Sequence, residues 1–336
     1  MFKTRAAYLK GPWTFQLREI ALPDSPPPGW IRLKVDACGV CGSDLNTASG
    51  TGDWQSFGHE IAGTVDAVGH GVPDLKPGQT VALESASFCG RCELCRDGRV
   101  DLCAKAPAFW GQPAMGFSTY MQAPACCAVP YAGLTAEEAC LVEPMGVAFD
   151  MLKTADVRMG QSVCVIGPGP IGLGAAALAR HRAAARTLVI GRPRAAARLA
   201  AAQALGLETR AITHTIVDEK DLHGRFDHVL LTAPPELIEP SLALLAYGGI
   251  LTYVGIATGD ARIQFDANRF HFSKLQLRAS FASPAMDFPA VMRLMQCGTL
   301  PGCALISHRF TLDEITKAML TCRDDKAGVI KVIVKP

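Results

Sequence analysis

Four closely spaced cysteines are the clearest chemical signal in this sequence. Cys89, Cys92, Cys95 and Cys103 have the spacing C-x2-C-x2-C-x7-C. Four thiolates this close can form a closed tetrahedral shell around one Zn²⁺, which supports folding rather than catalysis. Sulfur ligands also suit an iron–sulfur cluster, but a ferredoxin-type run has a last spacing of three, followed by proline. Here the last spacing is seven and Ala104 follows. We therefore predict a structural zinc rather than four unrelated buried cysteines.

A second set of metal-ligating residue types is spread more widely along the chain. Cys41 is followed by the run Gly58-His59-Glu60 and much later by Glu143. A catalytic zinc needs about three protein ligands and one exchangeable position. Cys41 and His59 would supply one sulfur and one nitrogen, and either Glu60 or Glu143 would supply the third ligand. We therefore expect two Zn²⁺ per chain.

Two polar residues follow Cys41 and suit supporting roles. Asp44 is expected to orient the ring of His59 from outside the ligand shell. Ser43 is expected to relay a proton through its hydroxyl. Zinc in such a site polarises an alcohol oxygen, which favours loss of a hydride from the carbon. The candidate catalytic residues are therefore Ser43, Asp44 and Glu60.

A glycine-rich turn provides a candidate dinucleotide site. Gly167-x-Gly169-x-x-Gly172 follows a strand-like run and opens an alanine-rich helical run, the context that separates this motif from a plain packing turn. The glycines allow the turn, the approach of the pyrophosphate and close helix packing. The expected contacts in this turn and beyond it are Gly167, Gly169, Pro170, Ile171, Gly172, Gly191 and Gly255.

The end of the next strand favours NADP over NAD. An NAD enzyme usually has Asp or Glu there to bind the ribose hydroxyls. This strand ends in Gly191-Arg192-Pro193-Arg194, and the segment 167–207 contains no acidic side chain. Arginine can bind a 2′-phosphate with two N–H groups. We expect Arg192 as the chief contact, supported by Arg194 or Arg198; the alternative is that these arginines form a solvated helix face.

Composition limits the other classes of function. The chain has 336 residues, 49% hydrophobic and 19% charged, which indicates a globular protein of two domains. A net charge of +2 without a basic block argues against nucleic-acid binding. No apolar run is long enough to span a membrane and no signal peptide is evident, so we expect a cytoplasmic protein without a membrane partner.

The pattern of expected elements divides the chain. The N-terminal part contains short β-type runs such as 30–40, 59–68 and 79–84, which suggest a barrel-like β domain. After Glu143, strands alternate with helices, which implies a parallel sheet. The run 275–281 is expected to close that sheet. We expect domains at 1–145, with a structural-zinc lobe at about 84–106, at 146–282, and a return segment at 283–336.

Together and in this order, Cys41-Gly-Ser-Asp, Gly58-His59-Glu60, the four-cysteine lobe and the later glycine turn resemble the zinc-containing medium-chain dehydrogenase/reductase family. The resemblance covers essentially the whole chain. It implies an α/β plus β fold, a GroES-like catalytic barrel with a Rossmann domain, and homodimers or homotetramers. Glu143-Pro144 resembles the polyol, threonine and sugar-acid dehydrogenase branch.

Two departures from the family pattern concern the substrate side. Many relatives have histidine where this chain has Asn46, and that histidine helps to pass the proton to solvent. Asparagine cannot take up and release a proton, so the sequence does not identify the route by which the proton reaches solvent. The segment between Cys41 and His59 is also short for the family, so we expect a trimmed loop over the substrate cleft.

The resulting hypothesis is reversible oxidation of a secondary alcohol to a ketone, with the hydride passing to NADP or NAD. The small-molecule substrate would be a polyol, a sugar acid or an amino alcohol. One alternative is a dehydrogenase of the same fold for primary aryl or aliphatic alcohols. Another is a non-catalytic zinc-binding module, but such a scaffold would need only the four-cysteine lobe.

Overall fold

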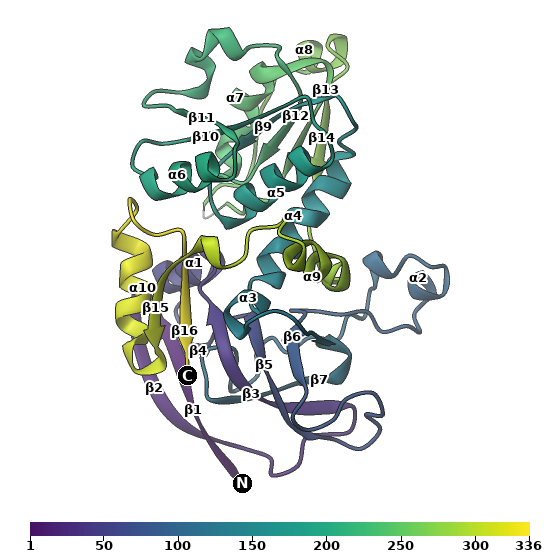
Figure 1. The fold of residues 1–336 in the computed structure, drawn as a ribbon, viewed down its shortest axis with the longest axis vertical. Coiled ribbons are helices and arrows are strands. Elements are labelled where there is room, and N and C mark those ends of the chain that lie inside the picture. Colours follow the sequence, from purple (N-terminus) through teal and green to yellow (C-terminus); the bar gives the residue numbers. More distant parts are fainter. Residues whose placement is uncertain (258) are drawn as a thin grey trace.

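The structure, a computed structural model, describes residues 1–257 and 259–336. Two bodies are stacked along the long axis, a parallel sheet with helices in one and mostly β structure in the other (Figure 1). Helix α4 (Val142–Ala155) runs between them. The predicted combination of an α/β body with a β body is confirmed.

The N-terminal body contains two sheets. A three-stranded sheet has the order β2-β1-β4, and a seven-stranded sheet has the path β15-β16-β3-β5-β6-β8, with β7 also paired to β3. Its first strands are β1 (Phe2–Lys10), β2 (Thr14–Leu22), β3 (Trp30–Gly39), β4 (Gln55–Ser56), β5 (Glu60–Val68), β6 (Thr80–Leu83), β7 (Tyr120–Pro124) and β8 (Ala128–Pro130). The three strand runs expected from the sequence correspond to β3, β5 and β6. The hairpin of β1 and β2 was not predicted.

Short helices connect the strands of this body. They are α1 (Gly42–Gly50), α2 (Glu93–Arg96) and α3 (Ala136–Ala139). Helix α2 belongs to the four-cysteine lobe, which projects sideways from the body (Figure 1). Helix α1 carries the residues that follow Cys41, so its N-terminus determines where Ser43 and Asp44 lie.

The second body is a six-stranded parallel sheet of order β11-β10-β9-β12-β13-β14. After its first residue, β9 is entirely buried and apolar, as expected for a parallel strand covered on both faces. The strands are β9 (Ser162–Ile166), β10 (Arg186–Gly191), β11 (Glu208–Ala211), β12 (Phe226–Leu231), β13 (Leu245–Tyr253) and β14 (Gln276–Ala279). The helices are α5 (Pro170–His181), α6 (Ala196–Ala204), α7 (Ile238–Ser241) and α8 (Ala267–Phe272). Strand β14 closes the sheet where the sequence predicted it.

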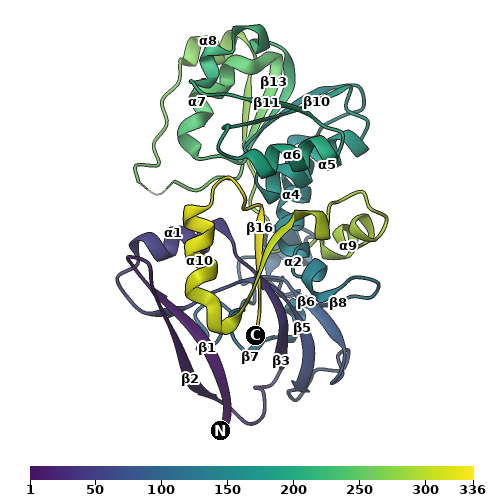
Figure 2. The same ribbon diagram turned by 60° about the vertical axis from the view of Figure 1, so that its left-hand side comes forward.

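The last part of the chain returns to the N-terminal body. After α9 (Phe288–Gln296), strand β15 (Ile306–Thr311) and helix α10 (Ile315–Asp324) lead to β16 (Lys331–Lys335). Strand β16 pairs with β15 on one side and antiparallel with β3 on the other. Figure 2 shows this segment beside β1, β2 and β3, directly below the second body. Among the described residues, no helix is long and apolar enough to cross a membrane.

Candidate active site

The N-terminus of α1 fixes Cys41 and Asp44 relative to each other. Cys41 occupies the N-cap position, and its backbone N–H donates to Asp44 Oδ2 at 2.9 Å. This carboxylate replaces a missing helix partner for the N–H, which explains why a run rich in Gly, Ser and Asn is helical here. Asp44 is buried, and its other oxygen lies 3.8 Å from His59 Nδ1. Asp44 and the His59 ring are therefore neighbours but are not hydrogen-bonded, so the predicted orienting role of Asp44 stays a prediction.

His59 is surrounded by negative groups. Burial lowers the pKa of His59, but the charge of Cys41, a hydrogen bond to it and the carboxylates of Asp44 and Glu143 together raise it well above its usual value. Its buried Nδ1 has no hydrogen-bond partner within the described part of the chain. A divalent cation held by Cys41 and His59 would offset this excess of negative charge around His59.

Glu143 lies in the first turn of α4, close enough to His59 for their charges to interact. Burial raises the pKa of Glu143 to about 7, an effect opposed by His59 and reinforced by Glu60. In the described residues its carboxylate accepts no hydrogen bond and forms no ion pair.

Glu60 has a different environment. Both of its oxygens lie 2.6 Å from Lys331 Nζ, and the two side chains are 1% and 4% exposed. Lys331 also donates to the carbonyl oxygen of Val40 at 3.0 Å. Burial lowers the pKa of Lys331, but the charges of Glu60 and Cys41 and the hydrogen bond to Glu60 together raise it above its usual value. Both carboxylate oxygens of Glu60 are thus paired with Lys331, whereas Glu143 has no ion pair within the described residues.

The ion pair of Lys331 and Glu60 spans strand β3 at the position of Gly39. Gly39 in β3 pairs with Glu60 in β5 on one side and with Ile333 in β16 on the other. A Cβ at Gly39 would overlap the Glu60 carboxylate. The absent side chain is therefore what allows Lys331 to reach Glu60 across the sheet. Sequence reasoning missed Lys331; the signal was a lysine within the otherwise apolar run Val329–Val334.

The four thiols of the lobe form a compact group. Their sulfur atoms all lie within 4.8 Å of one another, with Cys92–Cys95 at 3.5 Å and Cys89–Cys95 at 4.0 Å. A tetrahedron of sulfurs about 2.3 Å from a zinc has edges of about 3.8 Å, so the donor set fits this ion. Among residues 1–257 and 259–336, no other set of three His, Cys, Asp or Glu side chains is as compact. The set of Cys41, His59, Glu60 and Glu143 is wider.

A cavity of about 450 Å³ opens beside His59. Ser43 and Asp44 line it, as does Trp110, whose ring centroid is 5.1 Å from that of His59. Trp110 is half exposed, whereas the nearby aromatic Phe117 is fully buried and does not line the cavity. Asn46 is exposed on α1 and does not line the cavity.

The outer part of this cavity is aromatic and polar. Its wall includes Tyr8 and Trp54, with the hydroxyl of Ser56 and the amides of two glutamines nearby. Arg18 lies over both rings, 4.4 Å from the centroid of Tyr8 and 4.7 Å from that of Trp54. Within the described residues Arg18 forms no ion pair, so its charge is not neutralised at the edge of the cavity.

The glycine turn has the geometry expected for a dinucleotide site. Gly167 has a φ of +105°, which favours glycine, and its carbonyl accepts from Thr232 Oγ1 at 2.8 Å. A Cβ at Gly172 would overlap the Gly167 carbonyl. Gly169 caps α5 and Pro170 occupies its first turn, leaving the helix N-terminus open toward a second cavity of about 290 Å³.

This second cavity joins the two bodies. Gly169 to Gly172 and Thr232 line it from the parallel sheet, and Cys41, Glu60 and Lys331 line it from the other body. Arg198 and Lys326 also line it. The glycine turn and the Cys41 region therefore open onto one cleft. Gly255 lies beside this region, because a Cβ there would contact the Ala233 carbonyl after β12.

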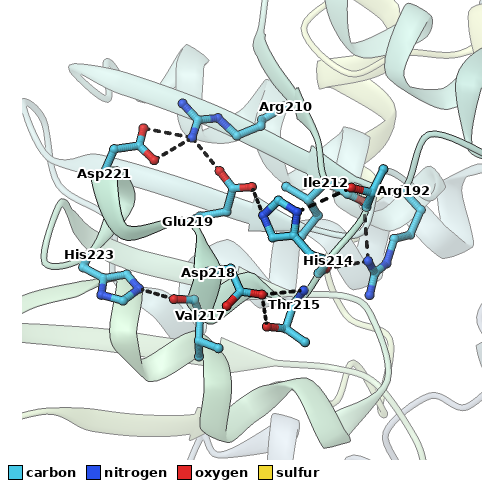
Figure 3. Close-up of polar contacts among 11 residues, drawn as sticks. Arg192, Arg210, Ile212, His214, Thr215, Val217, Asp218, Glu219, Asp221 and His223 are labelled. Carbon is cyan, nitrogen blue, oxygen red and sulfur yellow. Dashed lines mark hydrogen bonds and ion pairs between the residues drawn. The ribbon is translucent and has the colours of Figure 1, made fainter.

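Arg192 is held at the carboxyl end of the sheet. Its Nη1 donates to the carbonyl oxygens of His214 at 2.6 Å and Ile212 at 3.4 Å. The loop that bears these carbonyls is itself braced, because Glu219 accepts from Arg210 at 2.7 Å and lies 3.0 Å from His214 Nε2 (Figure 3). Arg192 has no carboxylate partner in the described chain and keeps its charge. A side chain would fit poorly at Gly191, because an added Cβ would lie too close to the ring of Pro168.

Comparisons with known proteins agree with both bodies. Residues 27–133 match the model of the alcohol dehydrogenase GroES-like domain, and residues 170–296 match that of the zinc-binding dehydrogenases. L-arabinitol 4-dehydrogenase of Aspergillus oryzae is 30% identical over 344 residues, covering 94% of this chain and 88% of the relative. L-galactonate-5-dehydrogenase of Escherichia coli is 29% identical and covers 87% of each chain.

Solved structures have the same fold. A zinc-binding dehydrogenase of Sinorhizobium meliloti bound to NADP is 26% identical, with a TM-score of 0.88 over 100% of both chains. An Escherichia coli alcohol dehydrogenase complexed with NADH is 24% identical, with a TM-score of 0.87 over 99% of both chains. Relatives of this fold thus include one bound to each of the two nicotinamide cofactors.

Proposed function

Because the chain belongs to the zinc-containing medium-chain dehydrogenase family, we propose that it oxidises a secondary alcohol reversibly to a ketone, with NADP as its preferred hydride acceptor. The observation that carries this proposal is one cleft that contains both the glycine turn of α5 and the cysteine, Cys41, beside His59. A metal ligand set and a dinucleotide motif on one cleft are what hydride transfer requires.

For the catalytic zinc we propose Cys41, His59 and Glu143 as ligands. Glu143 is favoured over Glu60 because Lys331 already occupies both oxygens of Glu60. A zinc ion there would polarise the substrate hydroxyl, and a bound nicotinamide would accept the hydride. Asp44 would hold the ring of His59 in place from the helix N-terminus.

Ser43 lines the cavity next to His59, so its hydroxyl is placed to take the proton of the substrate alcohol. Asn46 points to solvent and does not extend this path. We propose that the proton leaves Ser43 through water in the open cavity. The second zinc of the proposal is structural and would be held by Cys89, Cys92, Cys95 and Cys103.

The preference for NADP is supported by the end of β10. Gly191 offers no carboxylate to repel a 2′-phosphate, and Arg192 is held beside it by the loop after β11. Arg194 and Arg198 add further positive charge. Measurement of kcat/KM with NADP and NAD tests the preference, and a clear preference for NAD overturns it. The variant Arg192→Ala is expected to raise KM for NADP about tenfold or more and to leave KM for NAD nearly unchanged.

The proposed substrates are polyols and sugar acids. The cavity wall offers hydroxyl and amide groups suited to a polyhydroxylated chain, and Arg18 places a positive charge at its edge, where a carboxylate would be favoured. Among the relatives, one is an L-galactonate dehydrogenase and another an L-arabinitol dehydrogenase. Amino alcohols are also among the proposed substrates, because Glu143-Pro144 resembles the branch that includes the threonine dehydrogenases.

The deciding experiment is a substrate panel assayed with both cofactors. It should pair each sugar acid with the polyol of the same chain length and include simple primary alcohols, with zinc counted in the same preparation. Two zincs per chain and turnover of a secondary alcohol support the proposal. Turnover of primary alcohols alone favours the alternative enzyme, and one zinc without cofactor binding favours a scaffold.

The organisation of the chain is part of the proposal. We propose domains at 1–145 and 146–282, with 283–336 returning to the catalytic domain, because β9 to β14 form one sheet and β16 pairs with β3. We also propose a homodimer or homotetramer. Light scattering on the purified protein tests the second point, and limited proteolysis tests the first.

A further inference from the structure

Two basic side chains, Arg198 and Lys326, line the cleft between the two bodies, and a third, Arg194, lies near Lys326. Arg198 belongs to α6, Arg194 precedes that helix, and Lys326 follows α10 in the C-terminal segment. Arg198 and Lys326 line the cavity of about 290 Å³ together with Gly169 to Gly172. Burial and the charges of Arg198 and Arg194 lower the pKa of Lys326, so the three groups lie close enough to repel one another.

Hydrogen bonds hold this arrangement in place. The backbone N–H of Ala197 donates to the carbonyl oxygen of Ala327 at 3.0 Å, and Arg198 Nε donates to that of Val329 at 2.8 Å. Lys326 Nζ donates to the carbonyl oxygen of Cys322 at 2.9 Å. The C-terminal segment is therefore docked on the first turn of α6, with its lysine at the cavity.

None of the three cations forms an ion pair with a carboxylate in the described part of the chain, and the carboxylate whose charge reaches Lys326 is that of Asp324. Asp324 is paired with Arg323. Asp325 accepts from the backbone N–H of Gly328 at 2.7 Å and lies 3.9 Å from His308. Crowding three cations costs free energy unless an anion is bound between them. The other wall of the cavity, the N-terminus of α5, also favours an anion.

We infer that Lys326, together with Arg194 and Arg198, forms a binding site for a phosphate group of the dinucleotide. The inference rests on the proposed nicotinamide cofactor and adds a contact from the catalytic body that the glycine motif does not imply. The phosphate would be held by side chains of both bodies. Cofactor binding would therefore stabilise the docking of the C-terminal segment on α6, since an anion removes the repulsion between them.

Substitution of Lys326 tests this site without catalysis. We compare Lys326→Gln with Lys317→Gln, which removes the same charge from an exposed lysine on α10. The two probes NADPH and NADH are titrated by fluorescence, and ADP and 2′,5′-ADP by thermal shift. Lys326→Gln is expected to weaken binding about tenfold or more for each probe that carries the contacted phosphate, since a charged hydrogen bond is lost. Lys317→Gln should bind as the parent does.

The pattern of losses identifies the phosphate. Equal weakening of NADPH and NADH assigns the pyrophosphate, and weakening of NADPH and 2′,5′-ADP alone assigns the 2′-phosphate. Lys326→Arg, which keeps the charge, should restore most of the affinity and shows that the loss is not one of folding. Binding of all four probes by Lys326→Gln within twofold of the parent overturns the inference. Failure of the parent to bind any probe overturns the proposed function instead.

Discussion

Removal of Lys331 should destabilise the protein strongly. In Lys331→Met, the carboxylate of Glu60 would stay buried at 1% exposure without the cation that now touches both of its oxygens. Breaking one side of a buried ion pair costs about 3–5 kcal/mol. For a domain of this size, that corresponds to a fall in Tm of roughly 6–20 °C. Thermal unfolding followed by circular dichroism measures it.

Two further variants separate the charge effect from lost packing. Lys331→Met with Glu60→Gln removes both charges, so at least half of the lost stability should return, because no unpaired carboxylate remains. Lys335→Met removes a lysine of the same strand whose side chain is 56% exposed and lies 3.7 Å from Glu137, and it should cost under about 1 kcal/mol. A fall in Tm for Lys331→Met no larger than that for Lys335→Met would refute the reasoning, as would a double variant no more stable than the single one.

Three other changes should have distinct signatures. Cys89→Ser should lower the zinc content from two ions per chain to one and unfold the lobe, measured by metal analysis and proteolysis, whereas Cys297→Ser, at an exposed cysteine outside both zinc sets, should change neither. Glu143→Ala should lose the catalytic zinc and at least about 100-fold in kcat/KM while keeping the other zinc; retention of both ions would exclude Glu143 as a ligand. Burial raises the pKa of Glu84 to about 8, so the folded state binds a proton that the unfolded state releases above about 4.5. Stability should fall as the pH rises from 4.5 to 8, and Glu84→Gln should raise Tm at pH 8 but not at pH 4.5; equal Tm differences at both values would count against this.

Residues close in sequence were the ones whose grouping in space could be predicted. The four thiols of the lobe share one short segment, and their spacing alone indicated the compact group that the structure contains. The glycine turn could be predicted equally well, because Gly167 and Gly172 approach each other within the same short loop. The parallel sheet followed from the alternation of strand-like and helical runs after Glu143.

Elements that depend on partners distant in the sequence could not be predicted. Helix α1 has few good helix formers and exists because Asp44 caps it from within and Ala48 is buried beneath it. The β1–β2 hairpin begins with alternating residues whose burial depends on the strands around it. The sequence also left Glu60 and Glu143 equivalent as zinc ligands, since nothing local indicates which of them meets a lysine.

That choice between the two glutamates depends on the last strand of the chain. Lys331 is 271 residues from Glu60, and only the pairing of β16 with β3, next to the glycine at 39, brings them together. With Lys331 paired to Glu60, Glu143 is the other of the two candidate glutamates and has no ion pair within the described residues. The same segment carries Lys326 to the cofactor cleft. The C-terminal return would therefore influence both the proposed metal site and the proposed phosphate site, and loss of its docking should impair both together, although it contains neither Cys41 nor the glycine motif.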